Sequence, residues 1–121
     1  MIVEIPLKLP SLNEYIKASK IHRGNWNKGN QLKQDIQKDI AVYLRKLPNY
    51  EKPVTINFTW VESNKKRDLD NICFAKKFIL DALVNEGKLK NDNYKYVRGF
   101  MDHFEYGNET KVIIEVIENE L

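Results

Sequence analysis

The sequence of 121 residues has little cysteine and histidine, and each shortage excludes a class of protein. A single cysteine, Cys73, cannot form an intramolecular disulfide, and its apolar neighbours favour a buried side chain over a reactive one. The two histidines, His22 and His103, do not stand at metal-ligand spacing with another histidine or cysteine, so a zinc site is not expected. The absence of a Gly-rich phosphate loop and of a nucleophile elbow argues against ATPases and serine hydrolases.

Features of membrane and secreted proteins are also missing. No apolar run approaches the roughly 20 residues that span a bilayer. The first ten residues lack the basic region and long apolar core of a signal peptide. With 42% hydrophobic and 31% charged residues, the composition is that of an ordinary globular protein. We therefore expect a cytoplasmic protein with a single domain, residues 1–121.

The charges are distributed unevenly along the chain, although the net charge is only +3. Residues 1–50 contain nine basic and four acidic residues, whereas residues 91–121 contain three basic and seven acidic ones. A basic face that contacts nucleic-acid phosphates would explain this distribution. An ordinary solvated surface would explain it too, and charge alone favours that simpler interpretation.

Hydrophobic periodicity predicts an α+β domain in the order strand, two helices, strand, helix, strand, strand. Alternating or β-branched segments predict strands at residues 2–8, 53–61, 94–105 and 110–117. The last two strands are joined at Gly107-Asn108, a turn sequence that predicts a hairpin. We therefore expect a mixed or antiparallel sheet packed with helices.

Three helices are expected between these strands. A short one begins near Ser11, whose spacing from Glu14 matches a capping box. Apolar stripes at helical spacing predict two longer helices, at residues 30–46 and 71–85, with Gly87 suited to the end of the second. Residues 22–30 are rich in Gly and Asn and are expected to form a loop.

The segment Lys65-Lys66-Arg67-Asp68-Leu69-Asp70-Asn71 carries the most informative chemistry. Two carboxylates two residues apart lie on the same side of an extended backbone, and we expect Asp70 to precede a helix. Mg²⁺ needs few protein ligands and prefers carboxylates, while cations nearby suit phosphate. The same residues would equally serve as a helix cap on a solvated loop with surface ion pairs, and on spacing alone this simpler interpretation is favoured.

Residues 67–92 resemble the core motif of the RusA family of Holliday-junction resolvases. That motif consists of a D-x-D-N signature, a helix with a lysine, an Ala-Leu pair, a glycine and another aspartate. The corresponding elements here are Asp68-Leu69-Asp70-Asn71, Lys77, Asp81-Ala82-Leu83, Gly87 and Asp92. Near the N-terminus, Pro10-Ser11-Leu12-Asn13 is similar to the P-x-x-N segment of the family.

The resemblance implies an endodeoxyribonuclease that acts as a homodimer and cuts branched DNA at four-way junctions with Mg²⁺ or Mn²⁺. It also implies a role in DNA recombination and repair, in a pathway that prophages also encode. It implies that Asp68, Asp70 and Asp92 bind the metal and that a helix lysine assists catalysis. The interval between D-x-D-N and D-A-L is about one helical turn longer here than in the best-known members. Counting back from Asp81 selects Lys77 as this lysine, and Lys76 is the alternative.

Basic residues near the motif and in the N-terminal half are the candidates for contacts with DNA. They are Lys65, Lys66, Arg67, Lys76, Lys17, Lys20, Arg23 and Lys28, together with Asn13 of the P-x-x-N segment. Trp26 lies in the same basic region, where it could stack on a base at an open junction or pack onto the domain.

Two other functions are compatible with these residues. In a non-catalytic nucleic-acid-binding module the aspartates would be caps, and binding would not depend on Mg²⁺. In a nuclease for flaps or nicked duplex the same site would act on another DNA shape. A protein-interaction adaptor is a weaker alternative, because it leaves the acidic residues without a role.

Overall fold

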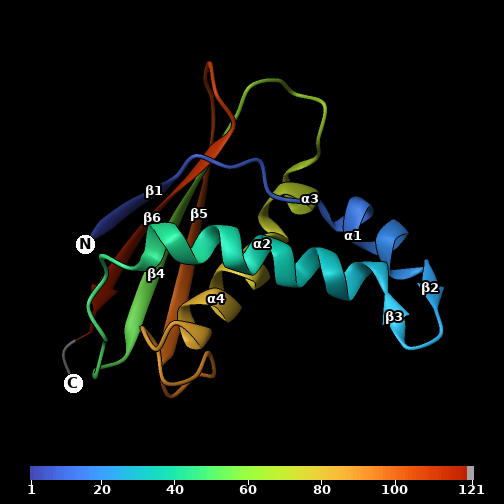
Figure 1. Cartoon of the computed structure of the whole chain (residues 1–121). Helices are drawn as coiled ribbons and strands as arrows, with labels where there is room; N and C mark the ends of the chain where they lie inside the picture. The colour runs from blue at the N-terminus through green and yellow to red at the C-terminus, as the bar shows by residue number, and fades with distance from the viewer. Residues whose placement is uncertain (120–121) are drawn as a thin grey trace.

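The computed structural model describes residues 1–119, which form a four-stranded sheet with helices packed on one of its faces (Figure 1). The strand order is β1-β6-β4-β5, with β1 (Ile2–Ile5), β4 (Val54–Glu62), β5 (Val97–Tyr106) and β6 (Lys111–Glu118). The helices are α1 (Leu12–Ser19), α2 (Lys28–Leu44), α3 (Leu69–Cys73) and α4 (Lys76–Asn85). The predicted α+β class and the order of its main elements are confirmed.

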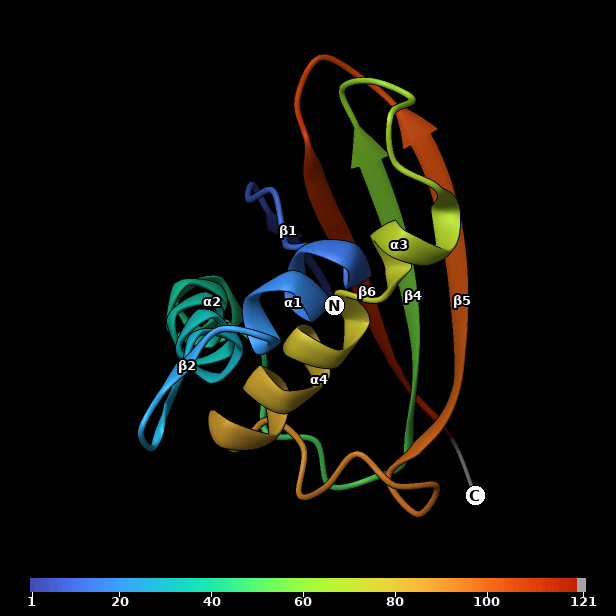
Figure 2. The same cartoon turned by 90° about the vertical axis from the view of Figure 1, so that its right-hand side faces the viewer.

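The hydrophobic core lies between the sheet and helices α2 and α4 (Figure 2). Alternate residues of the two central strands point into it, as the two-residue period of a strand requires. The largest fully buried side chains of sheet and helices are Ile5, Ile56, Phe58, Ile114, Ile40, Leu44, Phe78, Ile79 and Leu83. This packing fixes α4 against α2, and the candidate site described below is built on those two helices.

The end of α4 and the start of α1 follow local sequence signals. Ser11 is the N-cap of α1, and its hydroxyl accepts a hydrogen bond of 3.2 Å from the Glu14 amide. Gly87 adopts a φ of 72°, the left-handed conformation that terminates helices. None of the described helices is both long and apolar enough to cross a membrane.

The predicted hairpin between the last two strands is wrong. Strand β4 lies between β5 and β6, pairing with β5 in parallel and with β6 in antiparallel orientation. Residues 107–110 therefore cross the end of β4 and span about 10 Å, which is two strand spacings. The Gly107 amide donates to the Glu62 carbonyl at 3.0 Å, which holds this crossing against the last residue of β4.

The single helix predicted at residues 71–85 is interrupted. Helix α3 begins at Leu69, so Asp70 lies within its first turn, whereas we expected Asp70 to precede the helix. The helical spacing breaks at Phe74 and Ala75, where the Ala75 amide donates to the Ile72 carbonyl three residues earlier.

Residues 22–30, expected as a loop, contain a two-stranded ribbon of β2 (His22–Arg23) and β3 (Trp26–Asn27). Gly24 has a φ of 58°, which the tight turn between the strands requires. The ribbon lies at the N-terminal end of α2, away from the sheet (Figure 1). Helix α2 begins at Lys28, two residues before the predicted start.

Candidate functional site

A polar hollow between α2 and α4 contains two residues of the predicted site, Lys77 and Asp92. The Lys77 Nζ lies 3.0 Å from Asp81 Oδ1 and 3.6 Å from Asp92 Oδ2. The other carboxylate oxygen of Asp81 lies 3.1 Å from the Nζ of Lys33 on α2. The hollow has a volume of about 280 Å³, and its lining includes all four of these charged side chains.

These four charges alternate in sign and hold one another in place. The hydrogen bond from Lys77 to Asp81 raises the pKa of Lys77, and the negative charge of Asp92 adds to the effect. The lysine therefore keeps its proton near neutral pH. Its side chain is 56% exposed, so the ammonium group also faces solvent and is accessible to a phosphate.

Two neutral side chains extend the network along the groove between the helices. Gln37 of α2 donates to Asp81 at 3.4 Å, and Asn85 of α4 donates to Gln37 at 3.1 Å. Neither Lys33 nor Gln37 is among the site residues predicted from the sequence. The spacing of Lys77 and Asp81, four residues apart on one helix, was visible in the sequence, but their partners on α2 have no local signal.

Asp68 and Asp70 lie on α3, and both are exposed. Asp68 is the N-cap of this helix, yet its side chain makes no capping hydrogen bond. Within residues 1–119, neither carboxylate forms a hydrogen bond or an ion pair with another side chain. Asp68 therefore occupies the N-cap position that the capping interpretation predicts, but without the capping hydrogen bond. Within residues 1–119, both exposed carboxylates are available to a ligand.

The three predicted metal ligands do not meet in one chain. Asp92 contacts Lys77 beside α4, whereas Asp68 and Asp70 lie on the preceding helix. Among residues 1–119, no group of three histidine, cysteine, aspartate or glutamate side chains is placed to hold a metal ion. In their chemistry the carboxylates suit a hard divalent cation. The expectation that Asp68 and Asp70 share one side of an extended backbone is wrong, because Asp70 lies in the first helical turn, where residues two apart do not face each other.

Lys76, the alternative to Lys77, is engaged elsewhere. Its Nζ lies 2.7 Å from Asp102 of β5, whose second oxygen accepts a bond of 2.9 Å from the Trp60 indole. The same ammonium lies over the rings of Phe58 and Phe100, 5.4 and 4.8 Å from their centroids. These contacts, with a side chain only 18% exposed, fix Lys76 to the sheet and leave Lys77 at the hollow.

Comparison with known protein families gives a match over most of the chain. The protein-family model described as "Endodeoxyribonuclease RusA" matches residues 7–117. The chain belongs to the RusA endodeoxyribonuclease family. No curated protein matches the chain.

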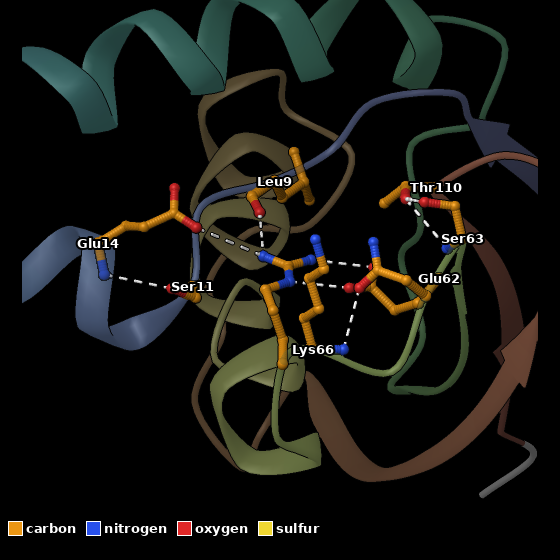
Figure 3. Close-up of polar contacts among 9 residues, drawn as sticks. Leu9, Ser11, Glu14, Glu62, Ser63, Lys66 and Thr110 are labelled. Carbon is orange, nitrogen blue, oxygen red and sulfur yellow. Dashed lines mark hydrogen bonds and ion pairs between the residues drawn. The ribbon is translucent and has the colours of Figure 1, made fainter.

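Arg67 of this RusA-family chain points inward, although we predicted that it contacts DNA. Its guanidinium forms two bonds to Glu62, of 2.8 and 2.9 Å, and donates to the Leu9 carbonyl at 2.9 Å. Glu14 lies 3.8 Å away on the other side, and the acceptors converge on one point between α1 and the end of β4 (Figure 3). Glu62 is only 6% exposed, so this is a buried ion pair.

The remaining basic candidates of the RusA-family chain are at the surface. Lys65 and Lys66 are exposed in the loop after β4, with the Lys65 ammonium 5.0 Å from the centroid of the Tyr106 ring. Exposed positions near α1 and the β2–β3 ribbon carry Asn13, Lys17, Lys20, Arg23 and Lys28. Within the described chain, the four basic residues of this set, Lys17, Lys20, Arg23 and Lys28, take part in no ion pair.

Cys73 is half-buried, and burial is the main cause that raises the pKa of its thiol, followed by the charge of Asp102. A raised thiol pKa is the opposite of what an activated nucleophile requires. The sequence favoured a buried side chain, and the structure places Cys73 at an intermediate depth.

Proposed function

We propose that this chain is a metal-dependent endodeoxyribonuclease that resolves Holliday junctions by two symmetric phosphodiester cuts. The observation that carries the proposal is the contact of Lys77 with Asp92, because it joins two distant parts of the family motif at one polar hollow. The exposed and unpartnered carboxylates of Asp68 and Asp70 add the donor groups that a nuclease of this kind requires.

The proposed reaction is hydrolysis of a DNA phosphodiester. A water oxygen forms a bond to phosphorus, and the bond from phosphorus to the leaving oxygen breaks. Mg²⁺ or Mn²⁺ held by Asp68, Asp70 and Asp92 would supply Lewis-acid activation of the water and charge neutralisation. The protonated Lys77 would donate to a phosphoryl or leaving oxygen, where negative charge develops.

The separation of Asp92 from Asp68 and Asp70 adds a condition to this proposal. The two parts of the ligand set have to approach each other when the metal, the DNA or a second subunit binds. An affinity for Mg²⁺ that rises in the presence of DNA or on subunit association would agree with this condition. A monomer that binds Mg²⁺ tightly through all three aspartates in the absence of DNA would contradict this condition.

A homodimer is part of the proposal, because two symmetric cuts need two copies of the site. Strand β5 forms an edge of the sheet and offers ten residues of backbone for pairing. Phe100 and Met101, both exposed, lie in the middle of this strand. The free backbone groups of an edge strand can pair with a strand of another chain.

The alternative functions are a binding module that does not cut and a nuclease for flaps or nicks. An assay with an end-labelled four-way junction, a flap and a matched linear duplex, each with Mg²⁺ and with EDTA, separates all three. Paired symmetric cuts in the junction alone, absent with EDTA, are expected. Binding without cutting would favour the module, and preferential cutting of the flap would favour the second nuclease.

A further inference from the structure

The β2–β3 ribbon has two faces with different chemistry. Arg23 is directly opposite Trp26 in the strand pairing, and the Lys28 amide donates to the Ile21 carbonyl at 2.9 Å. Because side chains alternate along strands, these four residues share one face of the ribbon. They line a hollow of about 530 Å³, and the Trp26 side chain at its edge is 42% exposed.

The opposite face of the ribbon anchors it to the helices. The Asn27 side chain donates to the Ser19 carbonyl of α1 at 3.0 Å and accepts from the Asn30 amide of α2 at 3.1 Å. Gly29 is buried against α1, where a Cβ would overlap the Ser19 hydroxyl. Helices α1 and α2 therefore hold the face with Trp26 in a fixed orientation. That orientation does not depend only on the pairing of β2 with β3.

The charge around this hollow is positive and unpaired. Arg23 and Lys28 line it, and Lys20, the C-cap of α1, directly precedes the lining residue Ile21 in the chain. None of the three forms an ion pair within residues 1–119, and the first turn of α2 contains no acidic residue. An exposed indole between free cations is the chemistry that recognises an unstacked base between two phosphates.

We propose that this hollow binds an unpaired base of branched DNA, with the base stacked on Trp26 and the flanking phosphates bound by Arg23 and Lys28. The proposal rests on the action on branched DNA proposed above and names a second contact with the same substrate. A base inside a duplex is stacked on both faces, so the hollow can take only an unstacked base, such as one in a single strand or at an opened branch point.

The location of the ribbon fits a base close to the proposed cut. Lys28 and Lys33 are five residues apart on α2, or roughly 7.5 Å along the helix axis. This distance is about two base-pair steps of DNA. Lys33 is bonded to Asp81 in the hollow that contains Lys77. Residues five apart also differ in direction around the helix, so a strand that contacts both hollows has to pass partway around α2.

The test compares a short oligothymidylate with an abasic oligomer that has the same number of phosphates, measured by fluorescence anisotropy in EDTA. We expect wild type to bind the base-bearing strand about 5- to 150-fold more tightly. Trp26→Ala should remove this preference, and Trp26→Phe should retain most of it. Arg23→Ala should weaken both complexes alike, whereas Lys46→Ala, at an exposed lysine beyond the far end of α2, should change neither.

Equal affinity of wild type for the two strands, or an unchanged preference in Trp26→Ala, would overturn the proposal. Self-association that is lost in Trp26→Ala would also overturn it, because the occupant would then be a second copy of the chain. Junction cleavage in Mg²⁺ by the same wild-type sample tests the proposed function separately. Cleavage without base preference would contradict only the ribbon proposal, and base preference without cleavage would contradict only the nuclease.

Discussion

Lys77 and Asp92 lie beside each other, with 3.6 Å between the ammonium nitrogen and a carboxylate oxygen, although one is in the first turn of α4 and the other in the loop beyond its end. Asp81 holds the same lysine from the next turn of the helix. The contact distinguishes Lys77 from its neighbour Lys76, which is bound to Asp102 on the sheet. Replacing Lys77 or Lys76 by alanine should therefore have different effects on cleavage and on stability.

We expect Lys77→Ala to lose junction cleavage while the stability of the fold stays close to wild type, because the side chain is largely solvent-exposed. Lys76→Ala should instead lower the free energy of unfolding by about 1–3 kcal/mol, because Asp102 loses its charged partner and two rings lose a cation. Urea denaturation and single-turnover cleavage of both variants measure these effects. A catalytic loss in a fully stable Lys76→Ala would contradict the assignment of Lys77.

Arg67→Ala should destabilise the fold by about 3 kcal/mol, because it leaves the buried carboxylate of Glu62 without its partner. Lys66→Ala, one residue earlier and exposed, should leave stability unchanged. It should instead weaken junction binding and reduce the slope of affinity against salt by about one. The measurements are urea denaturation and binding titrations at several salt concentrations. An Arg67→Ala variant that is fully stable but defective only in DNA binding would overturn the structural role of this arginine.

Tyr50→Phe should stabilise the protein by about 1 kcal/mol at neutral pH, because the buried Tyr50 hydroxyl has no hydrogen-bond partner within residues 1–119. Burial, followed by the charge of Glu118, raises the pKa of this phenol. The folded state therefore holds the proton more tightly than the unfolded state. The contribution that this raised pKa makes to the stability of wild type is present below about pH 10, and it is lost as the pH rises through the folded-state pKa of Tyr50.

The advantage of Tyr50→Phe over wild type should consequently widen above about pH 10. Tyr94→Phe is the matched control, because its ring is 73% exposed and its hydroxyl is in water. We expect that control to follow wild type at every pH in thermal denaturation curves. A Tyr50→Phe variant less stable than wild type at neutral pH would mean that the hydroxyl has a partner.

The parts of the fold that the sequence predicts are those with a strong local period. The alternation of Val54, Ile56, Phe58 and Trp60 marks β4, and the apolar stripes mark α2 and α4. The same periodicity does not reveal which strands are neighbours, because an alternating pattern defines a buried face and carries no information on pairing. The insertion of β4 between β5 and β6 is for this reason not visible in the sequence.

The break between α3 and α4 was hidden for a related reason. The apolar residues Ile72, Ala75 and Phe78 continue at helical spacing across the interruption, so the pattern predicts one helix. The role of Arg67 was also hidden, because three consecutive cations look alike in the sequence. Only the tertiary structure reveals that Glu62 is buried beside one of them.

The candidate site shows the same division between local and distant contacts. The motif identified Lys77, Asp92, Asp68 and Asp70, and these four await a test of function. It gave no indication that Lys33 of α2 completes the charge network, because that contact joins two helices. Partners across a helix interface require the packed structure.

In the proposed mechanism, the acidic residues of the family motif perform the chemistry. Asp70→Asn tests it most directly, in single-turnover cleavage of a labelled four-way junction with Mg²⁺, together with junction affinity in EDTA. Asp39→Asn is the matched control, since it removes an exposed carboxylate from α2. We predict that Asp70→Asn abolishes cleavage and retains or tightens binding, because a metal ligand and a charge that repels phosphate are both removed, while Asp39→Asn cleaves like wild type. Full cleavage by Asp70→Asn would contradict the metal site.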